Sequence, residues 1–203
     1  MVFQKKENHF KSLLLADMDS TMIEQECIDE LADMCGVGRE VKKITTRAMN
    51  GELGFHDALN ERVSLLAQCP SYIVEQVLEK RITFRPGGKT LVSTMKANGA
   101  YTALVSGGFT AFSIPIGTNL GFDEQHANIL VEENGVFTGK VAEPILGKNE
   151  KVNQLNRLVK ERGLMHSDVL AVGDGANDLG MLAIAGTGVA MHAKPIVAEK
   201  CDI

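Results

Sequence analysis

Three short apolar runs in this chain each end in a turn of polar and glycine residues. In order, the runs and their turns are SLLLA before DMDST, YTALV before SGGFT, and DVLAV before GDGAND. Each run has the length of a strand buried on both faces, and a helix-like segment follows each one. This alternation predicts a parallel sheet covered by helices, with the three turns together at the edge where such sheets bind ligands.

A long insert separates the first two runs. Within residues 23–84, apolar residues recur at helical spacing in segments 26–35 and 55–67. Segment 39–50, which ends at Gly51, and segment 71–80, which follows Pro70, are also typical of helices. This pattern predicts a small helical bundle, with Ser71 as the N-cap of its last helix. Further along, Asn134-Gly135 predicts a β-hairpin over residues 127–141.

We therefore expect an α/β fold: a Rossmann-like parallel sheet core with an inserted helical-bundle cap and a small β-hairpin. The predicted core comprises residues 1–22 and 85–203, and the predicted cap comprises residues 23–84. A length of 203 residues fits one domain with a sizeable insertion.

Composition excludes several classes of protein. The net charge of −5 favours neither nucleic acid nor an anionic membrane as a partner. No apolar run approaches the ~20 residues of a membrane-spanning helix, and residues 1–11 lack the apolar core of a signal peptide. The cysteines Cys27, Cys35, Cys69 and Cys201 form no CxxC pair. We expect buried free thiols in a reducing cytoplasm, without a disulfide framework.

The first turn places Asp17 and Asp19 two residues apart. In an extended segment, residues i and i+2 point to the same side. Neighbouring carboxylates repel, so they favour a bound cation or a shared proton. Mg²⁺ prefers oxygen ligands, and Asp174 of the third turn is placed to supply another carboxylate. The alternative for the pair alone is two solvated loop aspartates.

The second turn, SGG, lets backbone N–H groups approach a ligand closely. Ser106 and Gly107 could therefore bind a phosphate group, although a plain strand-to-helix turn is the commoner explanation. A cation for that phosphate would come from Lys151 or from Lys148, which the residues alone do not separate. For either lysine, the ordinary role is an exposed surface charge.

The third turn is GDGAND. Asp174 can face a metal, while Asn177 and Asp178 can bond the groups around the metal or hold the lysine. The alternative is a tight turn followed by an Asp/Asn helix cap.

Taken in this order, DMDST, SGG, a lysine opening a helix, and GDGAND resemble the haloacid dehalogenase-type phosphatases. The resemblance covers nearly the whole chain and selects Lys151 over Lys148. It departs at Met18, where Phe is commoner, and family members continue for a short segment beyond the position of Ile203. The insert resembles that of the members acting on phosphoserine through DMDSTMIEQECIDELA, VKKITTRAMNGELGF and ERVSLL.

The resemblance implies covalent catalysis. Asp17 would attack phosphorus and become a phosphoaspartate, while Asp19 would act first as general acid and then as general base. Mg²⁺ would be held by Asp17, the Asp19 carbonyl and Asp174.

Other residues would surround the phosphoryl group and the metal. The resemblance implies that Ser106, the Gly107 N–H and Lys151 hold the phosphoryl oxygens, with Asn177 also contacting substrate. Asp178 would order either the metal site or Lys151.

The resemblance also implies a small-molecule substrate, O-phospho-L-serine, cleaved to L-serine and phosphate in the last step of serine biosynthesis. Arg62 would bind the substrate carboxylate and Glu26 its ammonium, with Met49 and Phe55 closing the pocket. By residue type alone, Arg62 would be a surface cation, Glu26 a helix-terminus charge, and Met49 and Phe55 core residues.

Four alternatives keep some or all of the motifs. The chain could hydrolyse another small phosphomonoester, or transfer phosphate from phosphoserine to homoserine. It could also be a phosphoaspartate receiver module, although the long insert and GDGAND argue against that. A binding protein with an inactive site is disfavoured because no expected core position is missing. The sequence leaves open whether the chain forms a homodimer.

Overall fold

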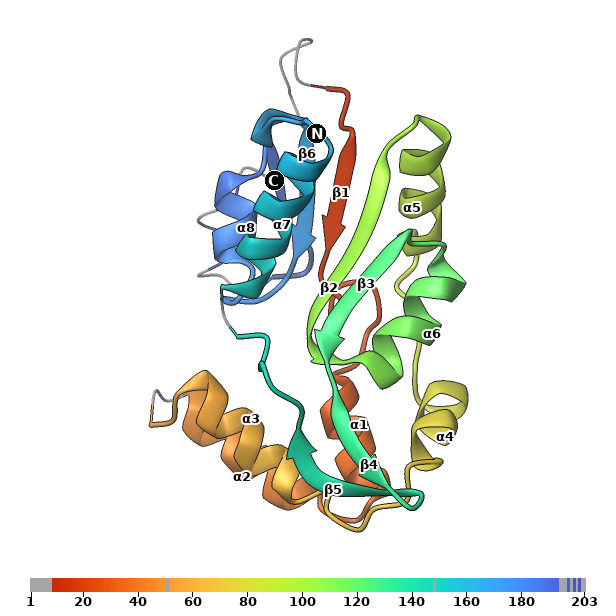
Figure 1. Ribbon diagram of the computed structural model, residues 1–203, viewed down its shortest axis with the longest axis vertical. Coiled ribbons are helices and arrows are strands. Elements are labelled where there is room, and N and C mark those ends of the chain that lie inside the picture. Colours follow the sequence, from red (N-terminus) through yellow and green to blue (C-terminus); the bar gives the residue numbers. More distant parts are fainter. Residues whose placement is uncertain are drawn as a thin grey trace.

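The computed structural model describes residues 9–49, 52–147 and 149–193, and the single residues 197, 199 and 201. Its centre is a five-stranded sheet in the order β3-β2-β1-β6-β7, in which all neighbouring strands are parallel (Figure 1). The three predicted runs form the adjacent strands β2, β1 and β6, so this prediction is confirmed. The strands are β1 (Leu13–Ala16), β2 (Tyr101–Phe109), β3 (Glu124–Asn128), β6 (Val169–Gly173) and β7 (Thr187–Ala190).

Helices cover both faces of this sheet, and the side-chain alternation of β1 serves both layers. Leu14 and Ala16 pack into the core cluster beneath α5 and α6, whereas Leu13 and Leu15 pack into the cluster beneath α7 and α8. Asp17 continues the parity of Leu13 and Leu15, and therefore faces the second layer. The helices are α5 (Gly88–Ala97), α6 (Thr110–Leu120), α7 (Glu150–Glu161) and α8 (Leu179–Ile184) (Figure 1).

The insert forms the four predicted helices, so this prediction is confirmed. The prediction of Ser71 as an N-cap is wrong, because Tyr72 is the N-cap and makes no side-chain capping bond. The Ser71 hydroxyl instead donates to the Gly135 carbonyl, at 3.3 Å, in the turn of the hairpin. The inserted helices are α1 (Cys27–Met34), α2 (Gly38–Met49), α3 (Phe55–Ser64) and α4 (Ile73–Lys80).

The predicted hairpin is present as β4 (Leu130–Glu133) and β5 (Val136–Val141). Asn134 and Gly135 have φ angles of 51° and 79°, which are the left-handed values that a two-residue hairpin turn requires. The hairpin begins later than predicted, because residues 127–128 belong to β3 of the main sheet. It packs on the insert at the carboxyl end of the sheet, where the Phe137 N–H donates to the Cys69 carbonyl at 2.9 Å (Figure 1).

The expectation of four free thiols is wrong. Cys35, just after α1, and Cys69, after α3, form a disulfide with their Cα atoms 5.8 Å apart. The cysteines are 34 residues apart in sequence, so only the packing of the inserted helices brings them together. Cys27 is a buried free thiol, as expected. Among the residues that the structure describes, no helix combines the length and apolar character needed to span a membrane.

Candidate active site

A cavity of about 320 Å³ lies at the carboxyl ends of β1, β2 and β6, between the sheet and the inserted helices. All three polar turns contribute to its wall, as does the insert. The predicted site residues that line it are Asp17, Asp19, Glu26, Phe55, Arg62, Ser106, Gly107, Asp174 and Asn177.

Next to this cavity, a buried lysine joins two carboxylates. The Lys151 Nζ lies 2.6 Å from Asp17 Oδ1 and 2.5 Å from Asp178 Oδ1. All three residues are buried, with Lys151 exposed by only 4%. Lys151 reaches Asp17 because α7 covers the sheet face to which Asp17 points. Lys148, the alternative, lies outside the described residues.

Neighbouring charges shift the pKa values of Lys151 and Asp17. Burial lowers the pKa of Lys151, but the carboxylates of Asp17 and Asp178 raise it by more than burial lowers it. The net shift is upward, so the ammonium stays charged. Burial raises the pKa of Asp17 well above its usual value, and Lys151 only partly opposes this. Asp178 and Asp19 raise it as well. With Asp19 and Asp174 also present, the site contains more acidic side chains than the single ammonium of Lys151 can pair with.

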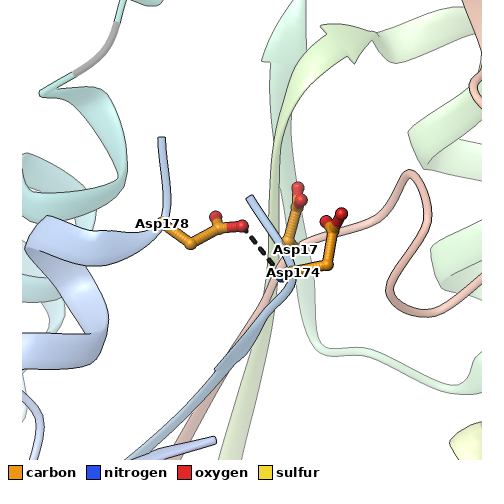
Figure 2. A group of neighbouring side chains, drawn as sticks. All are labelled: Asp17, Asp174 and Asp178. Atoms are coloured by element: carbon orange, nitrogen blue, oxygen red, sulfur yellow. Dashed lines mark hydrogen bonds between the residues drawn. The ribbon is translucent and has the colours of Figure 1, made fainter. Parts of the chain in front are cut away.

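A carboxylate cluster marks where a further cation fits. Asp17, Asp174 and Asp178 each offer an oxygen within 4.8 Å of the others (Figure 2). Asp178 Oδ1 accepts from Lys151, and its Oδ2 accepts from the backbone N–H groups of Asp174 (3.1 Å) and Gly175 (2.9 Å). Figure 2 shows the carboxylates of Asp17 and Asp174 pointing to the same side. This oxygen-rich, negatively charged donor set fits a hard divalent cation such as Mg²⁺.

The second acid of DMDST connects the sheet to the insert. Asp19 Oδ1 accepts from the backbone N–H of Cys27, at 2.9 Å, at the first turn of α1. Asp19 Oδ2 accepts from the Ser106 hydroxyl at 3.0 Å, and Ser106 Oγ in turn accepts from the Gly108 N–H at 2.9 Å. Asp19 is thus bonded directly to the SGG turn through one oxygen and to the start of α1 through the other.

The insert contributes opposite charges to the same cavity. Glu26 Oε1 accepts from the Ser20 hydroxyl at 2.7 Å. Glu26 lines the cavity, although the residue as a whole is exposed. Partial desolvation of its carboxylate, together with the charge of Asp19, raises its pKa to about 7. Half-buried Arg62 donates its Nε to the Ala58 carbonyl at 3.1 Å. Burial lowers the pKa of Arg62, and nearby carboxylates oppose that change.

The remaining predicted residues are placed as follows. Phe55 lines the cavity beside Gly107, where a Cβ would lie 3.7 Å from the ring. Asn177 is exposed and lines the cavity after the third turn. Met49 ends α2, and its side chain lies outside the described part of the chain.

Two polar residues of the site were not predicted. The Thr21 hydroxyl donates to Asp174 Oδ1 at 3.2 Å, and its place inside DMDST was the available signal. Asn128 contacts the Gly107 carbonyl, and nothing in the local sequence indicated this. It lies on β3, a strand that the sequence reasoning did not assign to the sheet.

Comparison with known proteins identifies the family. The sequence model for the haloacid dehalogenase-like hydrolases matches residues 14–183. The chain belongs to this family, and the predicted resemblance is confirmed. Membership in a hydrolase family argues against the receiver module.

Relatives within the family carry a more specific name. The chain is 43% identical over 195 residues to the phosphoserine phosphatase of Archaeoglobus fulgidus, covering 96% of this chain but only 56% of that protein. It is 47% identical over 187 residues to the phosphoserine phosphatase of Streptococcus thermophilus, covering 92% and 86% of the two chains. The chain thus spans about half of the first relative and most of the second.

Solved structures agree with the sequence relatives. A phospho-aspartyl intermediate analogue of phosphoserine phosphatase matches with a TM-score of 0.87 at 44% identity, covering 96% of this chain and 92% of that one. A substrate-bound phosphoserine phosphatase complex matches with a TM-score of 0.87 at 43% identity, covering 98% and 93%. The predicted likeness to phosphoserine phosphatases is therefore confirmed, and so is the α/β fold with its sheet and hairpin.

Proposed function

We propose that this chain is a Mg²⁺-dependent phosphomonoester hydrolase that converts O-phospho-L-serine to L-serine and phosphate through a phosphoaspartate. One observation carries the proposal: a single cavity joins the acids Asp17 and Asp19 to the oppositely charged pair Glu26 and Arg62. The acids suit phosphoryl transfer, and the pair suits an amino acid substrate. The names of the relatives and of the substrate-bound neighbour agree with this assignment.

In this proposal the carboxylates of Asp17 and Asp174 and the main-chain carbonyl of Asp19 hold Mg²⁺. The ion would supply positive charge that offsets the repulsion between Asp17 and the phosphate group. Asp178 has both oxygens engaged by Lys151 and by backbone N–H groups, so its role is to fix the lysine and the third turn.

The chemistry takes two steps. An oxygen of Asp17 forms a bond to phosphorus while the bond from phosphorus to the serine oxygen breaks, and Asp19 gives its proton to that oxygen. Asp19, now ionised, then takes a proton from water as the water attacks the phosphoaspartate. Phosphate leaves, and Asp17 is restored.

The phosphoryl oxygens would be bound by Lys151, the Ser106 hydroxyl, the Gly107 N–H and Asn177. Lys151 already lies 2.6 Å from Asp17, so its charge is next to the reacting oxygen. Ser106, which donates to Asp19 without substrate, would turn its hydroxyl toward the phosphate. Apart from this rotation of one hydroxyl group, the donors would be in place before substrate arrives, and prearranged charge is the main source of catalysis in phosphoryl transfer.

Substrate choice would come from the insert. Arg62 would bind the carboxylate of the substrate, and Glu26 its ammonium, with Phe55 and Met49 closing the cavity. Residues 23–84 would act as a lid on a core of residues 1–22 and 85–203, excluding water during transfer and reopening for release. The wider assignments to serine biosynthesis and to the cytoplasm stay predictions.

The test is phosphate release with Mg²⁺ from phosphoserine, phosphoethanolamine and other phosphomonoesters. Phosphoethanolamine keeps the ammonium but lacks the carboxylate that Arg62 would bind. We expect a strong preference for phosphoserine over the other esters. Arg62→Ala should remove this preference, whereas Asp17→Asn should abolish turnover of every ester. Asp33→Asn is the matched control, because Asp33 pairs with Lys42 at the surface, 3.5 Å away.

Two results would contradict the proposal. Equal activity on both amines would refute the role of Arg62, and turnover by Asp17→Asn would refute the nucleophile. Adding homoserine and looking for phosphohomoserine tests the transferase alternative, which would be favoured by transfer exceeding release.

A further inference from the structure

The pairing of β2 with β3 is interrupted at the predicted phosphate-binding turn. Val105 pairs with His126, and the next pair is Phe109 with Asn128. Residues 106–108 of β2 therefore lie opposite the single residue Ala127. The extra residues bulge out of the ladder, and they are the Ser-Gly-Gly segment that lines the cavity. A bulge of this kind leaves backbone groups without their partners in the sheet.

The side chain of Asn128 supplies the missing partner. Its Nδ2 donates to the Gly107 carbonyl at 3.0 Å, and its Oδ1 accepts from the Leu146 N–H at 2.7 Å. Asn128 is only 2% exposed, so water does not readily replace either bond. A carboxamide carries a donor nitrogen and an acceptor oxygen on the same carbon, so it satisfies both groups at once.

The two backbone groups bonded to Asn128 belong to segments that are both proposed to bind the phosphoryl group. Gly107 is in the turn whose N–H is proposed to bind phosphate. Leu146 is in the loop that leads into α7, on which Lys151 contacts Asp17. The segments come from different parts of the chain, and the amide of Asn128 links them.

We propose that Asn128 is a positioning residue for the phosphoryl site, where its amide sets the Gly107 backbone relative to the segment that carries Lys151. This inference rests on the proposed function only in assigning phosphate binding to that turn and that lysine. Asn128 itself lies outside the cavity lining and touches no reacting atom. Its loss would loosen the donors without removing any of them.

A purely structural role would produce a different result. Removing a buried amide lowers stability in any case, so a lower melting temperature alone decides nothing. A positioning role predicts that phosphate binding weakens in the folded protein as well. Because hydrogen bonds to a charged group are among the stronger ones, weakening those to phosphate should raise its Kd by roughly 10- to 100-fold.

The experiment is calorimetric titration of inorganic phosphate into the Mg²⁺-loaded protein at 25 °C. Asn128→Leu keeps the approximate shape and removes both bonds; if it does not unfold cooperatively, Asn128→Ala, which leaves room for water, is measured instead. One control is Asn98→Leu, since exposed Asn98 donates to the Thr94 carbonyl at 2.8 Å. The other is Val92→Ala, which destabilises a fully buried position away from the cavity.

We expect the Kd for phosphate to rise roughly 10- to 100-fold in the folded Asn128 variant and to stay unchanged in both controls. A wild-type Kd in that variant overturns the inference. If the wild type binds phosphate but prefers an ester other than phosphoserine, the proposed substrate fails while the role of Asn128 is still decided by the same titration. If the wild type binds no phosphate, both fall.

Discussion

Reducing the Cys35–Cys69 disulfide should destabilise the protein by an amount that follows from the length of the loop it closes. The two cysteines are 34 residues apart, and the loop contains α2 and α3. Closing such a loop removes about 12.6 cal/mol/K of entropy from the unfolded chain, or about 3.8 kcal/mol at 25 °C. For a protein of this size, that corresponds to a decrease of about 8 to 15 °C in melting temperature.

Thermal unfolding with and without a reducing agent measures this difference in one and the same protein. Thiol titration of the denatured, unreduced chain should count two thiols, since Cys27 and Cys201 lie outside the disulfide. A double variant, Cys35→Ala with Cys69→Ala, should melt at the lower temperature and show no further change on reduction. Activity at 25 °C should persist, because neither Cys35 nor Cys69 is among the described residues that line the cavity.

Two outcomes would refute this reasoning. A count of four thiols in the unreduced chain would show that the disulfide does not form. Complete reduction with a change in melting temperature below about 2 °C would show that loop entropy is not what the disulfide contributes.

Two further predictions concern charged residues in the cavity or next to it. In the metal-free protein, Lys151→Met should lower the free energy of unfolding by about 3 to 5 kcal/mol, because Asp17 and Asp178 are left buried without their cation; a loss below about 1 kcal/mol in urea unfolding would contradict this. The pKa of Glu26 is raised from 4.5 to about 7, so the folded state binds this proton more tightly than the unfolded chain does. As pH rises from 4.5 to about 7, the unfolded chain loses the proton first, and the free energy of unfolding decreases. Glu26→Gln should therefore leave the melting temperature unchanged near pH 4 and raise it at pH 8, and an equal effect at both values would count against the shift.

Local patterns in the sequence were sufficient for the three central strands, the inserted helices, the hairpin and the three polar turns. The site residues of the insert and the choice of Lys151 over Lys148 came from the family resemblance instead. Short apolar runs bounded by glycine and acidic residues identified β1, β2 and β6, because a strand buried on both faces needs a continuous apolar segment. Helical spacing identified the insert, and Asn134-Gly135 identified the hairpin turn through its left-handed backbone. Parallel strands place their carboxyl ends on one edge, so the grouping of the three turns also followed.

The tertiary structure decided the contacts between distant segments. The pairing of Lys151 with both Asp17 and Asp178 depends on which sheet face α7 covers. Asn128 gains its role only because β3 joins the sheet beside a bulge, and no local pattern encodes that neighbour. The disulfide and the misassigned Ser71 have the same explanation. Local sequence sets backbone preference, whereas a partner far along the chain is set by how the helices and strands pack.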